Sequence, residues 1–213
     1  ARLKSSRLPS KLLLKIEGIP IIRRTCLRCK LTGMEVFVFT DSEDIANAVS
    51  DLTTVIMTAG EYKNGTERLS KNIHHVPDHF NTVINVQGDE PFVEPENIKH
   101  ALALHEKRTH KTFYTTLHEA CDPEMALSSA RVKVAISDNR AQWYSRSLIP
   151  FNREGSPNFH TFTGIYVFDR VMLSKFSSMP NTPCQLSESI EQLKILEHGY
   201  HIASYPTLVQ STI

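Results

Sequence analysis

Short apolar runs alternate with segments whose apolar residues recur at helical spacing along most of the chain. The runs predict buried strands at residues 36–39, 55–57, 83–86 and 112–117. The segments between them predict helices at 20–33 and 42–52, a helix that starts at 65, and a helix at 95–107. Strands that alternate with helices in this way predict an α/β fold with a mostly parallel, doubly wound sheet that helices cover on both faces.

The alternation weakens between residues 121 and 183, where strands are predicted at 132–136 and 164–168. A last helix is predicted from Ser187 to His198, and a strand follows at 200–205. Since no repeat or linker divides the chain, we predict one domain over residues 1–213 with an inserted β-rich lobe at roughly 121–183. The sequence opens in a loop and stops soon after the last strand, so we expect a first strand and a C-terminal stretch to be missing from it.

Charge and composition narrow the classes of partner. The chain has 24 Lys and Arg against 23 Asp and Glu, a formal charge of +1, which gives no general electrostatic case for nucleic-acid binding. No apolar run approaches the length of a membrane span, and no signal peptide is visible. We therefore predict no nucleic-acid partner, no membrane insertion and a cytoplasmic location, with organelle targeting left open.

Four cysteines occur, at positions 26, 29, 121 and 184. Cys26 and Cys29 have CxxC spacing, which a zinc or redox site would also show. They fall inside a predicted helix that carries apolar residues at core spacing, and no second CxxC follows. We therefore predict that both are small core residues.

The stretch from Asn85 to Pro91 offers the clearest chemistry. It follows the predicted strand at 83–86, and ligands bind at the carboxyl ends of strands in open α/β sheets. Gly88 lets a ligand approach the backbone, and Asp89 is a carboxylate able to hold Mg²⁺ against a phosphate. An acidic strand-to-loop turn would have the same composition, so this stretch alone leaves both interpretations open.

The first eleven residues carry four cations and three hydroxyls without periodic apolar positions. Such a loop offers backbone N–H groups, hydroxyls and cationic side chains to the oxygens of a polyphosphate. It lacks the glycine and lysine spacing of a P-loop, and a solvated basic terminus is the alternative interpretation.

Five elements, taken in order, resemble the 3-deoxy-manno-octulosonate (Kdo) cytidylyltransferase family, the CMP-Kdo synthetases. They are residues 2–11, 64–68, 85–91, 145–150 and 191–193, and the Gln-Gly-Asp-Glu-Pro element is the most specific of them. The resemblance implies a nucleotide-diphospho-sugar transferase-like fold. It also implies that the anomeric hydroxyl of Kdo attacks the α-phosphorus of CTP and that pyrophosphate leaves, for lipopolysaccharide or related glycan synthesis. CTP and Kdo as substrates, Mg²⁺ as cofactor and a homodimer follow from the same resemblance.

The resemblance assigns a role to each candidate site residue. The catalytic candidates are Arg2, Lys11 and Asp89, with Asp89 also the metal ligand. The nucleotide-binding candidates are Ser6, Arg7, Asn64, Gly65, Thr66 and Arg68. The sugar-binding candidates are Gln87, Arg146, Tyr166, Glu191 and Gln192. Positioning and charge neutralisation supply most of the catalysis in such a transfer. Taken without the resemblance, Glu191 suits an exposed helix pair with Lys194, and Arg146 suits a surface position.

Some positions depart from the family pattern. Tyr62 and Phe162 stand where the family usually has histidine, Asn64 replaces a serine, and Gln185 replaces a glutamate. A second metal-binding aspartate, which the family carries after its last core strand, has no counterpart in this sequence. Two alternatives therefore stay open: a cytidylyltransferase for a Kdo analogue such as 8-amino-Kdo, or a truncated or degenerate homologue that binds nucleotide or dimerises without catalysis.

Overall fold

The structure is a computed structural model that describes residues 1, 10–153, 155 and 158–210 of the chain. The strands are β1 (Lys15–Ile16), β2 (Ile19–Pro20), β3 (Phe37–Thr40), β4 (Thr54–Met57), β5 (Thr82–Val86), β6 (Thr112–Cys121), β7 (Lys133–Ser137), β8 (Arg140–Ser145), β9 (Phe159–Asp169) and β10 (His201–Pro206). The α-helices are α1 (Ile21–Lys30), α2 (Glu43–Val49), α3 (Gly65–Asn72), α4 (Pro95–His105), α5 (Pro123–Ala126), α6 (Arg170–Phe176), α7 (Pro183–Glu188) and α8 (Glu191–Glu197). Two single 3-10 turns, η1 (Lys11–Leu13) and η2 (Ile73–His75), complete the described elements.

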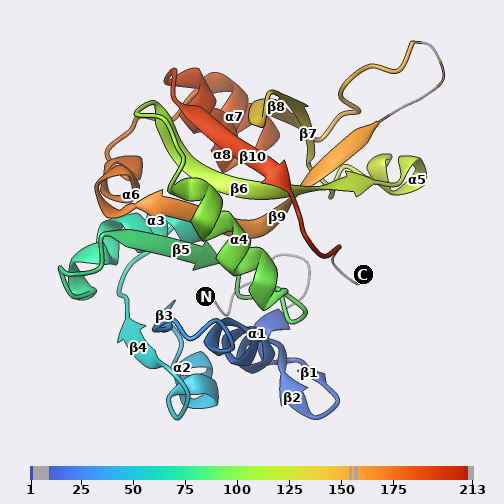
Figure 1. Ribbon diagram of the computed structural model, residues 1–213. Coiled ribbons are helices and arrows are strands. Elements are labelled where there is room, and N and C mark those ends of the chain that lie inside the picture. Colours follow the sequence, from blue (N-terminus) through green and yellow to red (C-terminus); the bar gives the residue numbers. More distant parts are fainter. Residues whose placement is uncertain (2–9, 154, 156–157, 211–213) are drawn as a thin grey trace.

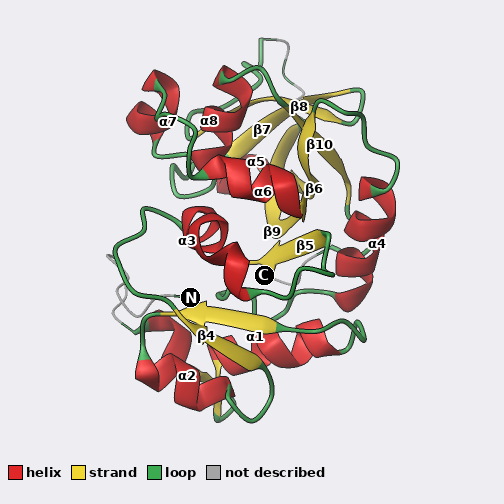
Figure 2. Ribbon diagram, turned by 90° about the vertical axis from the view of Figure 1, so that its left-hand side faces the viewer, coloured by secondary structure: helices red, strands yellow, loops and turns green. Residues whose placement is uncertain are grey.

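The strands form a six-stranded sheet in the order β5–β9–β6–β10–β8–β7, a separate β3–β4 pair and a short β1–β2 hairpin (Figure 1). Helices α6, α7 and α8 lie on one side of the six-stranded sheet, and α1 and α2 lie with β3 and β4 (Figure 2). The α/β class predicted from the sequence is confirmed. The strand directions are more mixed than a mostly parallel sheet, because β3–β4 and β6–β10 are parallel and the other described pairings are antiparallel.

The connection between β7 and β8 explains one of the antiparallel pairings. β7 and β8 are joined by Asp138 and Asn139, whose positive φ angles of 50° and 54° suit a two-residue hairpin. Antiparallel neighbours need only such a tight turn, whereas parallel neighbours need a crossover. β7, β8 and β9 all join the main sheet, so residues 121–183 build part of its body. The single domain with an inserted lobe stays a prediction.

The core of the described residues has one large cluster and three smaller ones. Aromatic side chains of β6, β9 and α6, among them Phe113, Phe168 and Phe176, pack with Leu193 of α8 to form the large cluster. Cys26 of α1 packs in a smaller cluster with residues of α2 and β3, and Cys29 packs against another, formed by residues of α4, β6 and β9. Both cysteines are free thiols; Cys26 is buried, as predicted for a core residue, whereas Cys29 is half-buried at the edge of the core.

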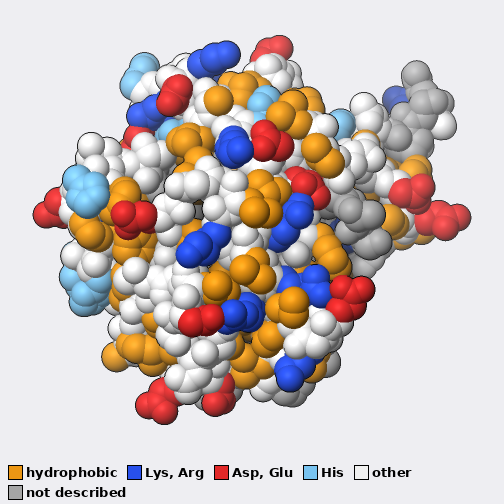
Figure 3. All heavy atoms as spheres, turned by 60° about the horizontal axis from the view of Figure 1, so that its bottom comes forward, with side chains coloured by type: hydrophobic (Ala, Val, Ile, Leu, Met, Phe, Trp, Pro, Cys, Tyr) orange, Lys and Arg blue, Asp and Glu red, His pale blue; other side chains and the backbone are white. Residues whose placement is uncertain are grey.

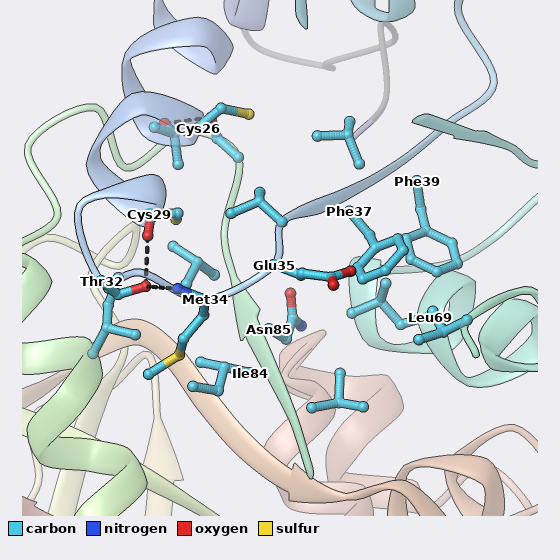
Figure 4. Close-up of a pocket in the computed structure, with 18 of the residues that line it drawn as sticks. Cys26, Cys29, Thr32, Met34, Glu35, Phe37, Phe39, Leu69, Ile84 and Asn85 are labelled. Carbon is cyan, nitrogen blue, oxygen red and sulfur yellow. Dashed lines mark hydrogen bonds between the residues drawn. The ribbon is translucent and has the colours of Figure 1, made fainter. Parts of the chain in front are cut away.

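A cavity of about 200 Å³ separates β3 from β5. Cys26 and Cys29 line it from α1, Phe37 and Phe39 line it from β3, and Asn85 lines it from β5 (Figure 4). Within the described residues, each of these two strands has its ladder partner on the side away from this cavity. The β3–β4 unit therefore meets the main sheet through side chains rather than through backbone hydrogen bonds.

The predicted helix over 187–198 is wrong in detail, because the chain forms two helices there. Thr182 begins α7 with a capping box that includes Gln185, and Ser189 ends it in the left-handed region at φ 52°. The break sets Glu191 and Gln192 in the first turn of α8. A continuous helix would have turned these two side chains to other directions.

The molecular surface agrees with the balanced charge of the chain. The face seen in Figure 3 intersperses Lys and Arg with Asp, Glu and hydrophobic side chains. On helix α1, Arg23 pairs with Asp51 and Arg24 pairs with Glu17. No helix within the described ranges is long and apolar enough to cross a membrane.

Arg170, the first residue of α6, holds the connection that leads into β5. Its guanidinium donates to the carbonyl oxygens of Pro77, Phe80, Ile73 and Val76. We expect Arg170→Met to lower the free energy of unfolding by about 2–4 kcal/mol, because these partly buried carbonyls lose their donor. Urea unfolding followed by circular dichroism measures this change.

Lys99→Met is the matched control, because Lys99 forms an exposed pair with Glu96. We expect it to change the free energy of unfolding by less than about 0.5 kcal/mol. Equal effects of the two substitutions would contradict the role given to Arg170.

Candidate active site

A cavity of about 620 Å³ lies where β5 ends, beside the starts of α3 and α8. Most of the candidates predicted from the sequence line it: Lys11, Asn64, Gly65, Arg68, Gln87, Asp89, Tyr166, Glu191 and Gln192. They come from segments far apart in the chain, so the fold brings them together. Arg2, Ser6 and Arg7 lie outside the described residues.

The turn after β5 is fixed on the backbone of β9. The Gln87 N–H donates to the Gly164 carbonyl at 2.9 Å, which continues the β5–β9 pairing beyond the strand. A Cβ at Gly164 would stand 2.7 Å from Glu90 Oε1 and 3.0 Å from Gln87 Cβ. Only glycine leaves room for the two side chains. This close approach holds Gln87 and Asp89 at the cavity.

Lys11 and Asp89 form an ion pair in the cavity wall. Lys11 Nζ lies 2.6 Å from Asp89 Oδ2, with side chains 41% and 42% exposed. The solvent-accessible pair places a cation and a carboxylate where a polyphosphate and its counter-ion can reach both.

Glu90 lies next to Asp89, and no role was predicted for it from the sequence. Burial, together with the charges of Asp89 and Glu119, raises its pKa to about 7. In the sequence, Glu90 is visible only as the second carboxylate of the Asp-Glu pair. The fold shows that its side chain packs over Gly164.

The start of α3 presents a small polar edge to the cavity. Asn64 caps the helix, its side-chain oxygen accepting from the Glu67 N–H at 2.8 Å. Gly65 lies beside the Gln87 amide, since a Cβ there would be 3.8 Å from Gln87 Nε2. This edge therefore combines a small residue with a polar amide at the cavity.

The sequence predicted that Arg68 binds nucleotide, but its guanidinium is hydrogen-bonded to other residues of the chain. It is 4% exposed and donates to Asp41 Oδ2 at 2.8 Å and to Thr58 Oγ1 at 2.9 Å. Its guanidinium also lies 4.8 Å from the centre of the Tyr62 ring. Arg68 therefore ties α3 to the β3–β4 unit while it lines the cavity.

Thr66 is not brought into the cavity lining, in contrast to its predicted contact with the nucleotide. Its side chain is 2% exposed and its hydroxyl donates to Glu191 Oε1 at 2.8 Å. The first turn of α3 points Thr66 inward, toward α8, while Asn64 and Gly65 face the cavity.

Glu191 is enclosed rather than paired on the surface. Burial raises its pKa to about 7, against the hydrogen bond from Thr66 and the charge of Lys194. Lys194 is itself 5% exposed and donates to the Phe176 carbonyl, so the alternative of an exposed Glu191–Lys194 pair is wrong.

Arg146 is the other candidate that the structure does not bring into the cavity lining. Its Nε donates to the Glu188 carbonyl at 2.7 Å and its Nη1 donates to the Ser129 carbonyl at 2.8 Å. These bonds hold the guanidinium against the backbone between α7 and α8. The expected contact with a sugar carboxylate needs a guanidinium that faces the cavity, so the structure does not support it.

One part of the cavity has an apolar wall. Phe162 and Ile190 line it beside Gln185 and Leu186. Gln185 also receives the Thr182 N–H in the capping box of α7. The two departures from the family pattern, Phe162 and Gln185, therefore lie at the cavity.

Asp89 is the residue that would bind a divalent cation in this cavity. Its carboxylate is 42% exposed and faces the cavity beside Lys11. Within the described ranges no group of three or more His, Cys, Asp or Glu side chains gathers to hold a metal. One carboxylate completed by substrate phosphates is nevertheless a usual arrangement for Mg²⁺. The residues present fit a metal that arrives with the nucleotide.

Comparison with known proteins decides the family. The model of the family described as cytidylyltransferase matches residues 1–202. The chain belongs to the cytidylyltransferase family. It is 37% identical to the 3-deoxy-manno-octulosonate cytidylyltransferase of Zea mays, over 95% of this chain and 70% of the relative. It is 39% identical to the enzyme of Arabidopsis thaliana named 3-deoxy-manno-octulosonate cytidylyltransferase, mitochondrial, over 94% of this chain and 71% of the relative.

Solved structures agree with this assignment. A structure titled as CMP:2-keto-3-deoxy-manno-octonic acid synthetase complexed with CTP matches with a TM-score of 0.88 and 32% identity, covering 97% of this chain and 88% of that chain. A cytidylyltransferase from Leptospira borgpetersenii, with a TM-score of 0.58 and 15% identity, shares the fold. The family and the fold inferred from the sequence motifs are confirmed.

The contact between Glu90 and Gly164 gives a prediction for the site. We expect Gly164→Ala to lower kcat/KM by about tenfold or more and the free energy of unfolding by about 1–3 kcal/mol, since the new Cβ displaces Glu90 and Gln87. Steady-state kinetics and urea unfolding measure the two effects.

Gly199→Ala is the control, because Gly199 has φ 79° with open space around it. It introduces backbone strain of about 1–2 kcal/mol away from the cavity. We expect it to reduce stability and to leave kcat/KM unchanged. A parallel loss of kcat/KM in both variants would show that destabilisation, and not the contact at Glu90, lowers the rate.

Proposed function

We propose that this chain transfers the cytidylyl group of CTP to Kdo and releases pyrophosphate. The observation that carries the proposal is one cavity that joins Asn64 and Gly65, the Lys11–Asp89 pair, and Glu191 with Gln192. Membership of the cytidylyltransferase family and the relatives named for this reaction support it.

The base of the nucleotide would lie against the start of α3. Gly65 leaves space there, and the Asn64 amide supplies polar atoms at the cavity. Cytosine offers an amino group and a carbonyl on one edge, which a short polar edge can read. The triphosphate would then extend toward Lys11, with the cations Arg2 and Arg7 and the hydroxyl of Ser6 as further proposed contacts.

The sugar acid would lie next to the base, where Gln87, Gln192 and Tyr166 line the cavity. Glu191 suits a hydroxyl donor of the sugar. Because Arg146 is held against backbone carbonyls, we propose no contact of its guanidinium with the sugar carboxylate in this arrangement.

The transfer is a displacement at the α-phosphorus. A bond forms from the anomeric oxygen to this phosphorus, the α–β phosphoanhydride bond breaks, and pyrophosphate leaves with the electron pair while the hydroxyl proton is lost. Lys11 neutralises charge that builds on the phosphates. Asp89 would hold Mg²⁺, which when bound supplies further neutralisation and orientation of the phosphate oxygens. The protein residues then act chiefly by position.

Pyrophosphate release from the chain with CTP, Kdo and Mg²⁺ tests the proposal. We expect release to require both substrates, to stop when a chelator removes the metal, and to fall at least about 100-fold in Asp89→Asn, which removes the only charge of that side chain.

Asp138→Asn is the matched control. Asp138 lies in the β7–β8 turn at φ 50°, a conformation that asparagine also adopts readily. It should release pyrophosphate at the rate of the unaltered chain. A folded chain that binds CTP and releases no pyrophosphate would contradict the proposal and favour the non-catalytic alternative.

A Kdo analogue is the second candidate substrate, since Phe162 and Gln185 both line the cavity. An apolar ring and a neutral amide at that wall change which substituent the sugar end accepts. The same assay with Kdo and 8-amino-Kdo in parallel compares their kcat/KM values. A higher value for Kdo supports the first proposal, and a higher value for 8-amino-Kdo supports the second. The homodimer, the cytoplasmic location and the role in lipopolysaccharide synthesis stay predictions.

A further inference from the structure

A hydroxyl at the start of α3 meets a carboxylate at the start of α8. Thr66 Oγ1 donates to Glu191 Oε1 at 2.8 Å, although the two residues are 125 positions apart. Asn85 of β5 also contacts this hydroxyl, with its Nδ2 at 3.5 Å from Thr66 Oγ1. Because the amide is a donor, it leaves the Thr66 hydroxyl hydrogen directed at Glu191.

The second carboxylate oxygen of Glu191 has a different environment. Oε2 is buried and has no hydrogen-bond partner among the described residues, while Glu191 lines the large cavity. A buried acceptor without a donor is costly, so such groups commonly mark a place where a ligand completes the contact. Thr66 satisfies one oxygen and leaves the other for a donor that enters the cavity.

We propose that Thr66 is a positioning residue that holds the Glu191 carboxylate in place to receive a hydroxyl of the sugar substrate. The inference rests on the proposed function and deepens it. It replaces the nucleotide contact that the sequence suggested for Thr66, whose side chain lies behind the cavity wall.

The arrangement is suited to this task. Threonine is β-branched and therefore has few side-chain rotamers, whereas a glutamate has three rotatable bonds. Both residues lie in the first turns of their helices, and Asn85 anchors the hydroxyl to the sheet. One hydroxyl thus fixes the flexible carboxylate relative to the two helices that border the cavity.

Thr66→Val and Thr66→Ser test the proposal, because valine keeps the shape and serine keeps the hydroxyl. We expect Thr66→Val to raise the KM for the sugar about tenfold, the scale of one lost hydrogen bond to a charged group, and to change the KM for CTP less than about twofold. Thr66→Ser should stay within about threefold of the unaltered chain for both substrates.

A double-mutant cycle separates positioning from general packing. In the Glu191→Gln background, Thr66→Val should raise the KM for the sugar much less than it does alone, since the carboxylate that it positions is absent. Equal effects in both backgrounds would overturn the proposal, as would a Thr66→Ser variant that behaves like Thr66→Val.

A measurement that does not depend on catalysis tests the role of Thr66 even if the proposed reaction is wrong. Carbon-13 NMR of labelled glutamate carboxyls, with Glu191→Gln to assign the signal, follows the titration of Glu191. Its surroundings carry Lys194 on the same helix and the tyrosines Tyr114 and Tyr166 from β6 and β9. Because the Thr66 hydroxyl favours the charged form, Thr66→Val should raise the Glu191 pKa above about 7, and Thr66→Ser should not.

Thr112→Val is the matched control for the loss of a buried hydroxyl. Thr112 is 6% exposed, and its hydroxyl contacts Thr109 at the start of β6. It should change neither the KM for the sugar nor the Glu191 signal. An altered Glu191 titration without Kdo-dependent pyrophosphate release would refute the proposed reaction and retain the contact. An unaltered titration in Thr66→Val would refute the positioning role itself.

Discussion

The pairing of β9 with both β5 and β6 is the constraint on which the rest of the structure depends. Through it, the turn after β5 is carried over Gly164, and the Gln87 N–H binds the Gly164 carbonyl. Tyr166 of the same strand lines the cavity. Other aromatic residues of β9 pack in the core against α6 and α8. A side chain at Gly164 would meet Glu90 and Gln87, so the main sheet and the site share one packing requirement.

Some charged groups around the cavity are bonded to other parts of the chain, and others are accessible to solvent. Arg68 donates to an aspartate and Arg146 donates to backbone carbonyls, and these hydrogen bonds join elements that are distant in sequence. Lys11 and Asp89 remain accessible to solvent. Glu90 and Glu191 are half-buried, and burial raises the pKa of each to about 7. A polyanionic substrate with its own cation, as proposed, would complement this mixed set of charges.

Much of the local structure was predictable because it depends on nearby residues. Ser42 and Asn64 cap their helices, and the apolar runs mark β3, β5 and β6. Strand direction was not predictable, because an apolar run reads the same in either direction and β9 reaches its partners through long-range pairing. The single helix expected over 187–198 failed at Ser189, where the chain enters the left-handed region without a glycine.

The sequence by itself determined the family, the α/β class and the candidates gathered at the cavity, since motifs in order record which chemical groups the chain carries. Tertiary structure alone decided which way those groups point. It turned Thr66 toward Glu191, held Arg146 against carbonyl oxygens and packed Glu90 over Gly164. The physical reason is that a residue type fixes which bonds a side chain can make. The neighbours that compete for those bonds are chosen by packing between segments far apart in the chain.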